Sequence, residues 1–274
     1  MSECNSCPSK NNCNSKDTCM IKSSPHSSVK NIIGVMSGKG GVGKSTVSAM
    51  IGKDLNKKGF KVGILDADVT GPSIPRLLGI SDKKATANEL GIVPVNTDSG
   101  IKVVSLNLLM EDENQPVIWR GPLIAGIVEQ FWTDVIWGEL DYLIIDMPPG
   151  TGDVALTVMQ SIPISGIIMV SVPQDLVSMI VSKAINMVKK MNIPILGIVE
   201  NMSYIKCPDC NKKIRIFESD NTLKFLKENN IELLGELPMC KDIANISEES
   251  GQILNEDINK TFKEIGDKIL KLSK

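Results

Sequence analysis

Short aliphatic runs alternate along the chain with longer segments that mix apolar and polar positions. Five runs are apolar at consecutive positions, which is typical of strands buried on both faces of a parallel sheet. These runs are NIIGVMS (31–37), KVGILD (61–66), YLIID (142–146), SGIIMVSVP (165–173) and PILGIVEN (194–201). Shorter strand-like runs, GIVPV and GIKVVSL, lie within 91–120. The mixed segments predict helices over 44–58, 122–137, 175–191 and 220–229.

This alternation predicts an α/β fold with a doubly wound, mostly parallel sheet flanked by helices. No internal repeat and no second core is evident, so residues 31–274 are expected to form one domain. Residues 1–30 differ, because they are rich in Ser, Asn, Lys and Cys and contain almost no aliphatic residues. They predict a tail or a metal-folded appendage. The only histidine, His26, has no evident orienting partner there and is expected to be a bystander.

The stretch SGKGGVGKST (37–46) lies between the first predicted strand and the first predicted helix. Gly38, Gly43, Lys44 and Ser45 match the phosphate-loop pattern G-x-x-x-x-G-K-[ST]. Glycines let backbone N–H groups turn toward phosphate oxygens, and the helix N-terminus adds a positive dipole. Lys44 is expected to reach the β- and γ-phosphates, and the Ser45 hydroxyl to hold Mg²⁺. The other loop residues expected to bind the nucleotide are Gly40, Gly41, Val42 and Thr46.

A dinucleotide-binding site is the competing interpretation of these glycines. Three of them also satisfy G-x-G-x-x-G, and Asp66 follows at a strand end about 20 residues on, where a Rossmann fold places its ribose-binding acid. Lys44 and Ser45 argue against that fold, because a Rossmann helix normally turns apolar residues to the sheet at this point. A glycine turn without function is the remaining alternative.

Carboxylates at two other strand ends favour a nucleoside triphosphatase. Asp146, in DMPPGTGD, supplies the group needed to hold the water shell of Mg²⁺, and the Pro-Gly loop after it suits a γ-phosphate switch. Asp66 and Asp68, in LDADVTGPSIP, follow the second strand and face the same edge of the sheet. One of them, with Asp68 favoured, is expected to orient the attacking water. The alternative is that these aspartates cap the next helix.

The loop carries a second lysine, Lys39, and KGGVGKST thereby resembles the deviant Walker ATPases, which include MinD, ParA, the arsenite-pump ATPase and the nitrogenase iron protein. The resemblance implies that Lys39 reaches across a face-to-face dimer to the nucleotide of the partner. Such a lysine would act as an arginine finger does, stabilising charge on the transferred phosphoryl group only after dimerisation. The alternative is a solvated loop lysine.

Cys207 and Cys210 form a C-x-x-C motif in ENMSYIKCPDC. This spacing lets two thiolates converge on one metal, while half of a zinc knuckle, a redox pair or two plain loop cysteines stay open as alternatives. Two cysteines do not complete a four-ligand site. Two copies of the loop that meet on a two-fold axis supply four thiolates, and the lysine motif independently suggests a dimer.

Five motifs together resemble the Mrp family, also called the ApbC group, whose members are ATPases that carry and deliver iron–sulfur clusters. They are GKGGVGKST, DADVTGPSIP, WRGP (119–122), DMPPGTGD and ENMSYIKCPDC, and the resemblance spans essentially residues 31–274. It implies ATP and Mg²⁺ as cofactors, slow hydrolysis coupled to transfer, and a [4Fe–4S] cluster bridged between two protomers by Cys207 and Cys210. It also implies that Asn201 contacts adenine, and it implies a cluster scaffold as donor and apo iron–sulfur proteins as acceptors. The chain departs from the family in ESDNT, which lacks the usual glycines, and at Thr70, where an aromatic residue is expected.

Four further cysteines lie in the polar N-terminal region with the spacing C-x₂-C-x₅-C-x₅-C. They are Cys4, Cys7, Cys13 and Cys19. The first three resemble the N-terminal cluster site of the eukaryotic Mrp relatives, whose fourth cysteine lies upstream instead. A second iron–sulfur cluster is favoured, with zinc or a thiol-rich tail as alternatives. Cys240 is expected to be structural, because free cysteine packs as a small hydrophobe.

Composition limits the other function classes. The chain has 274 residues and a formal net charge of −2, so nothing general points to nucleic acid or an anionic membrane as partner. No apolar run approaches the roughly 20 residues of a transmembrane helix, and the N-terminus lacks a signal-peptide h-region. A cytoplasmic protein is expected, and in that reducing compartment the seven cysteines are not expected to form structural disulfides.

The main competing function is a ParA/MinD-like positioning ATPase that acts on DNA or membrane, with a structural zinc at the C-x-x-C. It would need a basic surface or a terminal anchor. One amphipathic stripe near the C-terminus is a candidate anchor, although docking on the sheet explains it equally well and is favoured. The stripe consists of Ile258, Phe262, Ile265, Ile269 and Leu272. An electron donor like the nitrogenase iron protein is disfavoured, because the cysteines of that protein are widely separated, whereas Cys207 and Cys210 form a C-x-x-C.

Overall fold

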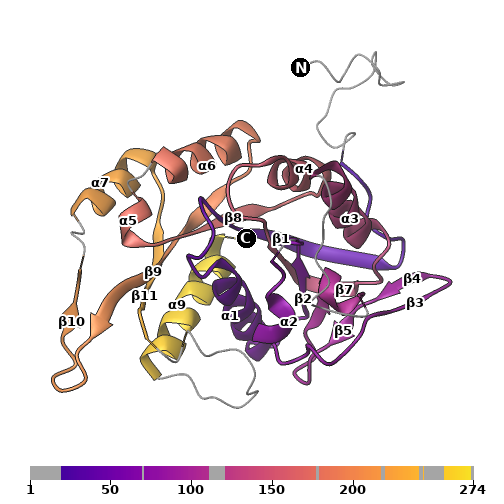
Figure 1. Ribbon diagram of the computed structural model, residues 1–274, viewed down its shortest axis with the longest axis horizontal. Coiled ribbons are helices and arrows are strands. Elements are labelled where there is room, and N and C mark those ends of the chain that lie inside the picture. Colours follow the sequence, from indigo (N-terminus) through magenta and orange to yellow (C-terminus); the bar gives the residue numbers. More distant parts are fainter. Residues whose placement is uncertain are drawn as a thin grey trace.

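The computed structural model contains one large sheet covered by helices on both faces (Figure 1). It describes residues 20–69, 71–110, 121–176, 179–216, 220–240, 243 and 256–272. Thr70 and the cysteines at positions 4, 7, 13 and 19 lie outside these residues.

The sheet is mostly parallel, as the sequence predicts. Its strands follow the order β10-β9-β8-β1-β7-β2-β6-β5, and β11 also pairs with β9. Among the described strands of this sheet, the antiparallel pairs are β9–β10 and β5–β6, and β3 and β4 form a separate antiparallel pair. The strands are β1 (Ser27–Ser37), β2 (Val62–Asp66), β3 (Thr86–Asn88), β4 (Gly91–Val93), β5 (Val95–Asn96), β6 (Lys102–Val104), β7 (Gly138–Asp146), β8 (Gly166–Ser171), β9 (Ile195–Lys206), β10 (Lys213–Ile214) and β11 (Leu233–Pro238).

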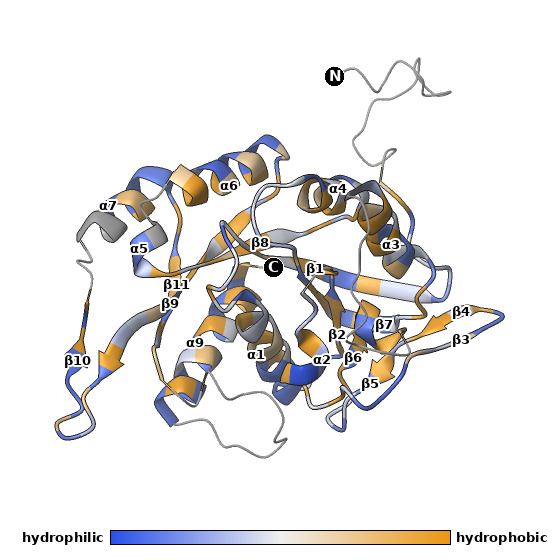
Figure 2. Ribbon diagram, viewed as in Figure 1, coloured by the Kyte–Doolittle hydropathy of each residue, from blue (hydrophilic) through white to orange (hydrophobic). Residues whose placement is uncertain are grey.

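Burial on both faces explains why the central strands are apolar at consecutive positions. Along β1, Ile32 and Met36 join one apolar cluster, whereas Ile33 and Val35 join the other. Because successive side chains of a strand point to opposite faces, the two clusters lie on the two sides of one sheet. Figure 2 shows these strands as a largely hydrophobic centre between helices with mixed surfaces.

The helices divide between the two faces. Residues of α3, α4, α6 and α7 contribute to the first cluster, and residues of α1, α2 and α9 to the second, in agreement with the two layers in Figure 1. The helices are α1 (Lys44–Lys57), α2 (Ile74–Leu77), the 3₁₀ turn η3 (Leu106–Leu108), α3 (Gly121–Thr133), α4 (Asp153–Ser161), α5 (Pro173–Leu176), α6 (Met179–Lys190), α7 (Asp220–Asn229) and α9 (Glu256–Leu272).

Two predicted helices have different bounds in the structure. The helix predicted over 122–137 ends at Thr133, because the chain beyond it pairs with β4. Ile92 N donates to the Asp134 carbonyl at 2.8 Å, and Ile136 N donates to the Ile92 carbonyl at 2.9 Å. Over the range predicted as the helix 175–191, the structure describes α5 to Leu176 and α6 from Met179 to Lys190, and residues 177–178 lie outside the described residues.

The first strand begins at Ser27 instead of residue 31, because β7 begins at Gly138 and its ladder with β1 pairs these two residues. The preceding residues lie against α3 and α4. Ile21 N donates to the Ser161 carbonyl at 3.0 Å, and Trp132 Nε1 donates to the Ile21 carbonyl at 2.8 Å. The described end of the region predicted as a tail therefore belongs to the folded body.

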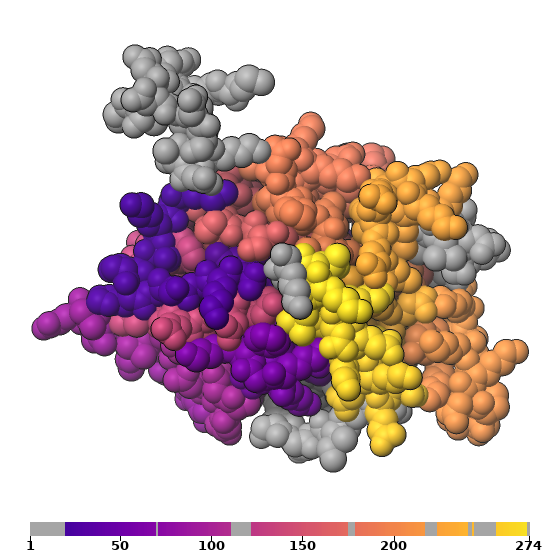
Figure 3. Space-filling model, turned by 180° about the vertical axis from the view of Figure 1, so that it is seen from behind, coloured from indigo at the N-terminus to yellow at the C-terminus, as the bar shows by residue number. Residues whose placement is uncertain are grey.

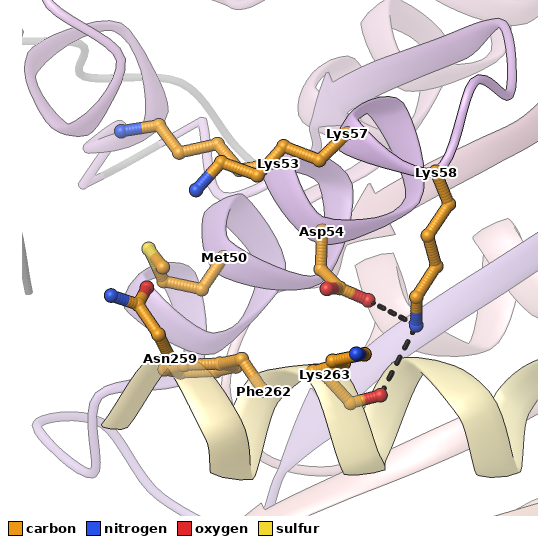
Figure 4. A pocket seen from close by; sticks show the side chains of 8 residues that line it. All are labelled: Met50, Lys53, Asp54, Lys57, Lys58, Asn259, Phe262 and Lys263. Atoms are coloured by element: carbon orange, nitrogen blue, oxygen red, sulfur yellow. Dashed lines mark hydrogen bonds and ion pairs between the residues drawn. The ribbon is translucent and has the colours of Figure 1, made fainter. Parts of the chain in front are cut away.

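The C-terminal helix α9 is docked. Ile258, Phe262, Ile265 and Ile269 are buried, while Leu272 is exposed. Figure 3 shows α9 in yellow between early and late parts of the chain, and it contacts α1 and β11. In Figure 4 Phe262 lies beside Met50 of α1, and Lys58 bonds to both Asp54 and the Lys263 carbonyl, at 2.7 and 3.1 Å.

Among the described residues, none of the helices combines the length and the apolar composition needed to cross a membrane. Cys240 is half-buried and packs against the second cluster, as expected for a structural cysteine.

Candidate functional site

The predicted phosphate loop and two predicted acidic strand ends meet at one edge of the sheet. The loop follows β1, Asp146 ends β7, and Asp66 ends β2. Because the strands are adjacent in the order β1-β7-β2 and Asp66 pairs directly with Asp146, these groups are neighbours. This edge is formed by the carboxyl ends of parallel strands, where α/β folds bind ligands.

The loop backbone has the conformation that its glycines allow. Gly41 and Gly43 have φ angles of 79° and 81°, which side chains rarely permit, and α1 begins directly after Gly43. The amide of Asn201 lies over this turn and donates from Nδ2 to the Val42 carbonyl at 2.9 Å. A Cβ at Gly43 would collide with that amide. Asn201, which lies on β9, is therefore fixed beside the loop.

Lys44 points into the site and is almost fully buried. Its Nζ lies 2.8 Å from Asp146 Oδ2 and 3.8 Å from Asp68 Oδ2. Ser45 Oγ donates to the same Asp146 oxygen at 2.6 Å. The structure thus brings together the lysine, the hydroxyl and two of the carboxylates that the sequence predicts.

These groups fit a magnesium site. Asp146 and Ser45 present a carboxylate and a hydroxyl to the same point, and hard oxygen ligands are those Mg²⁺ prefers. Ser48, which the sequence analysis did not single out, donates from Oγ to Asp146 Oδ1 at 2.7 Å. It thus fixes the carboxylate through the oxygen that Ser45 does not contact. The helical spacing between Lys44 and Ser48 could have revealed it, since residues four apart share a helix face.

The two aspartates at the end of β2, Asp66 and Asp68, differ in environment. Asp66 is fully buried and accepts bonds from Asp68 N at 3.2 Å, Ile74 N at 3.3 Å and Ser105 Oγ at 3.2 Å. Burial, and secondarily the charge of Asp146, raise the pKa of Asp66 to about 8, although the Lys44 charge opposes this shift. Asp66 therefore anchors the start of α2 and the β2 loop. Asp68 is the aspartate that faces Lys44.

The rest of the loop lies nearer the surface. Lys39, Gly40 and Gly41 are exposed, whereas Gly38 is buried against Ile180 at the start of α6. Ser37 Oγ donates to the Lys39 carbonyl at 2.8 Å and supports the turn from below. Thr46 is half-buried in the first turn of α1. Lys39 thus lies on the outer surface of the loop, in contrast to Lys44.

The C-x-x-C motif lies on a hairpin formed by β9 and β10, which projects from the body in Figures 1 and 3. Cys207 N donates to the Lys212 carbonyl and Asn211 N donates to the Cys207 carbonyl, both at 3.0 Å. Asn211 takes a φ of 58° and closes the turn. Cys207 is half-buried and Cys210 is exposed, and both are free thiols.

Backbone N–H groups of Cys210 and Asp209, together with the Cys210 side chain, hydrogen-bond to the Cys207 sulfur and lower the pKa of this thiol. The hairpin therefore favours the thiolate, which is the form that binds metal. Within the described part of the chain no group of three or more His, Cys, Asp or Glu side chains is placed to hold a metal. The described hairpin carries two thiols, Cys207 and Cys210.

The fold and the phosphate loop define a P-loop nucleotide triphosphatase. A sequence profile for NUBPL iron-transfer P-loop NTPases, within the ParA group, matches residues 28–272. The chain belongs to this family. It is 49% identical over 263 residues to the iron-sulfur cluster carrier protein of Clostridium perfringens. This alignment covers 90% of this chain and 92% of the Clostridium protein. The protein of the same name from Methanocaldococcus jannaschii is 44% identical, with 97% and 96% covered.

Solved structures agree with this assignment. A nucleotide-binding protein from Archaeoglobus fulgidus, in complex with ADP, aligns with a TM-score of 0.71 and 41% identity over 86% of this chain and 88% of that chain. The cell division ATPase MinD of Pyrococcus furiosus aligns with a TM-score of 0.60 and 22% identity over 88% and 99%. The second likeness concerns the fold alone.

Proposed function

We propose that this protein is an ATP-binding and ATP-hydrolysing carrier that holds a [4Fe–4S] cluster between two copies of the chain and transfers it to apo-proteins. The observation that carries the proposal is the placement of two thiols, one of them with a pKa lowered by hydrogen bonds to its sulfur, on an exposed hairpin of a P-loop NTPase. The names of the relatives, which are iron–sulfur cluster carriers, support the same cargo.

The nucleotide half of the function uses the buried loop. Lys44 and the backbone N–H groups from Gly38 to Thr46 would bind the phosphates, and Asn201 would contact the adenine. Ser45 and Asp146 would hold Mg²⁺, which supplies charge neutralisation on the phosphate oxygens. Asp68 faces the same space and would orient the attacking water. On nucleotide binding Lys44 would exchange its ion pair with Asp146 for phosphate.

The cluster half of the function needs a homodimer. Cys207 and Cys210 of one chain supply two thiolates, and a second copy related by a two-fold axis completes four. Lys39 lies on the outer surface of the loop, where a partner chain can be reached, and would stabilise the phosphoryl charge in that partner. Slow hydrolysis would then depend on the same dimer that holds the cluster.

The cluster is cargo in this scheme. A scaffold protein would load it, and apo iron–sulfur proteins would receive it. We place this exchange in the cytoplasm, where a reducing environment keeps thiols free. Neither DNA nor a membrane is needed as a partner. Cys4, Cys7, Cys13 and Cys19 lie outside the described residues, and we propose that they bind a second iron–sulfur cluster.

Iron and acid-labile sulfide analysis after anaerobic reconstitution tests the proposal. Wild type should contain about four irons and four sulfides per dimer beyond those removed by deleting residues 1–19, as expected for one bridging [4Fe–4S] cluster. The Cys207→Ser/Cys210→Ser double variant should lose the bridging cluster and its transfer to an apo-acceptor while nucleotide affinity stays unchanged. Cys240→Ser is the matched control, because Cys240 packs in the body and should not affect iron content.

Other results would reject parts of the proposal. Stoichiometric zinc without sulfide would identify a structural metal site, and retained transfer by the double variant would exclude the hairpin as carrier. Iron that is unchanged on removal of residues 1–19 would exclude the second cluster. ATP-dependent sedimentation with liposomes or DNA would instead favour a positioning ATPase.

A further inference from the structure

The nucleotide loop and the cysteine hairpin are joined by one strand, β9. Asn201 of this strand bonds to the phosphate loop, and Cys207 follows the end of the strand six residues later. At about 3.3 Å per residue, this separation is on the order of 20 Å. A displacement at Asn201 therefore has a short covalent route to the cysteines.

This strand is irregular at the point where it leaves the nucleotide site. Glu200 pairs with Glu236 of β11, and Tyr204 pairs with Pro238, so four steps along β9 match two steps along β11. Met202 lies inside this bulge with a φ of 54°, an uncommon value for a residue other than glycine. Met202 N donates to Asn201 Oδ1 at 3.0 Å. The Asn201 side chain thus bonds to the phosphate loop on one side and to the bulge on the other.

The returning arm of the hairpin is attached separately. Arg215, directly after β10, forms two contacts with the Glu236 carboxylate, Nη1 to Oε1 at 2.7 Å and Nη2 to Oε2 at 2.8 Å. Arg215 Nη1 also donates to Ser203 Oγ at 3.3 Å, and Ser203 is part of the bulge. The Ser203 hydroxyl in turn bonds to the buried carboxylate of Glu200.

A two-pronged arginine–carboxylate contact fixes orientation as well as distance. The ladder between β9 and β10 contains two residue pairs. The Arg215–Glu236 ion pair thus holds one arm of the hairpin to β11 and, through Ser203, to the bulge beside Asn201. The returning arm is thereby tied to the same bulge of β9 that begins beside Asn201.

We propose that Arg215 is a positioning residue that couples bound nucleotide to the setting of Cys207 and Cys210. When nucleotide engages Asn201 and the phosphate loop, the bulge shifts, and the Arg215–Glu236 ion pair carries this shift to the hairpin. For cluster release the inference rests on the proposed carrier function. The mechanical coupling itself does not depend on a cluster.

Labelling of the cysteines in the cluster-free full chain tests the coupling. N-ethylmaleimide is added with and without Mg·ATP, and the rates at Cys207 and Cys210 are separated by peptide mass spectrometry. In wild type we expect Mg·ATP to change these rates at least about fivefold, the lower end of ordinary coupling between sites. In Arg215→Met we expect the ratio of the rates with and without Mg·ATP to fall most of the way to one, because the side chain keeps its bulk but loses both contacts to Glu236 and only the strand itself still joins the two sites.

Two further variants separate positioning from general damage. Arg215→Lys keeps the charge and should restore part of the nucleotide effect. Lys268→Met is the matched control, because it removes the ion pair with Glu232 at the other end of β11 and should retain the wild-type ratio. ATP affinity should be the same in all four proteins.

A wild-type ratio of one, or an unchanged ratio in Arg215→Met, would overturn the inference. If ATP protected the cysteines from labelling only by causing dimerisation, the ratio in Arg215→Met would be unchanged. Iron content is measured separately on the same proteins. A protein that binds no cluster but shows nucleotide-dependent labelling would reject the carrier function and retain the coupling. A protein that binds the cluster but shows no nucleotide-dependent labelling would reject the coupling only.

Discussion

The phosphate loop and the cysteine hairpin lie on the same molecule but are built in opposite ways. In the loop, Lys44 and Asp146 are buried, and their polar atoms are paired within one chain. On the hairpin, Cys207 is half-buried, Cys210 is exposed, and both are free thiols. The groups of the first site are thus already paired within a single chain, whereas the proposed cluster site on the hairpin would need a second chain to supply four thiolates.

Lys39 offers the sharpest test of this contrast, because it would make the loop depend on a second chain as well. Lys39→Ala should lower ATP hydrolysis by about a thousandfold, the lower range for a charge supplied in trans, and leave ATP affinity unchanged. The measurement is steady-state phosphate release beside equilibrium nucleotide binding.

Mixing the inactive Lys39→Ala and Lys44→Ala proteins is the decisive control. If Lys39 acts across the dimer, heterodimers pair an intact Lys44 with an intact Lys39 and some hydrolysis returns. No recovery on mixing would mean that Lys39 acts on its own nucleotide.

Ser48 tests how far the loop depends on buried pairing. Ser48→Ala removes a buried donor to Asp146 and should lower the free energy of unfolding by about 1–3 kcal/mol in urea titrations. Ser45→Ala is the matched control, because it removes a half-buried donor to the same carboxylate and should mainly weaken Mg²⁺-dependent nucleotide binding. Equal stability of Ser48→Ala and wild type would contradict the assigned role.

Asp66 makes the buried edge sensitive to pH. Its pKa is about 8 in the folded chain and 3.8 in an unperturbed aspartate. Between these values the folded chain holds a proton that the unfolded chain has released, so this contribution to stability falls as pH rises, by at most about 1.4 kcal/mol per unit. Asp66→Asn should remove this slope, which urea unfolding at pH 5.5 and 7.5 measures. Identical slopes for the two proteins would refute the shifted pKa.

Substitution of a residue on the hairpin should lower the free energy of unfolding least. Lys213 Nζ lies 4.3 Å from the centre of the Tyr204 ring and fastens the two arms. Lys213→Ala should lower the free energy of unfolding by about 0.5–1 kcal/mol, since an exposed cation–π contact is weak. The readout is the same urea titration, and a loss larger than that of Ser48→Ala would reverse the comparison between the two regions.

Local pattern was sufficient for much of the fold. The five apolar runs are strands because each is buried on both faces, and the phosphate loop follows the first of them as its motif predicts. The end of α3 at Thr133 was not predictable, because residues 134–136 pair with β4, which lies some forty residues earlier in the chain. A strand partner that is distant in sequence leaves no local signal.

The same limit applies to the sites. The meeting of Lys44, Ser45 and Asp146 was predictable, because the phosphate-loop pattern and a carboxylate at the end of another apolar run are both local features of the sequence. Ser48 and Arg215 were not singled out, because each acts on a carboxylate from another strand, Asp146 and Glu236 respectively. The sequence favoured Asp68 over Asp66 without a structural reason, and burial supplies one, since Asp66 is fully buried and Asp68 is the aspartate that faces Lys44.

The sequence by itself determined the class of fold, the nucleotide loop and the pair of cysteines, because each of these depends on residues close together in the chain. Tertiary structure decided which side chains meet across strands, and above all the register with β11 that places a bulge in β9 between Asn201 and Cys207, which follows the end of this strand. The physical reason is that burial, ion pairing and strand register are properties of contacts between distant segments, which exist only once the sheet has formed.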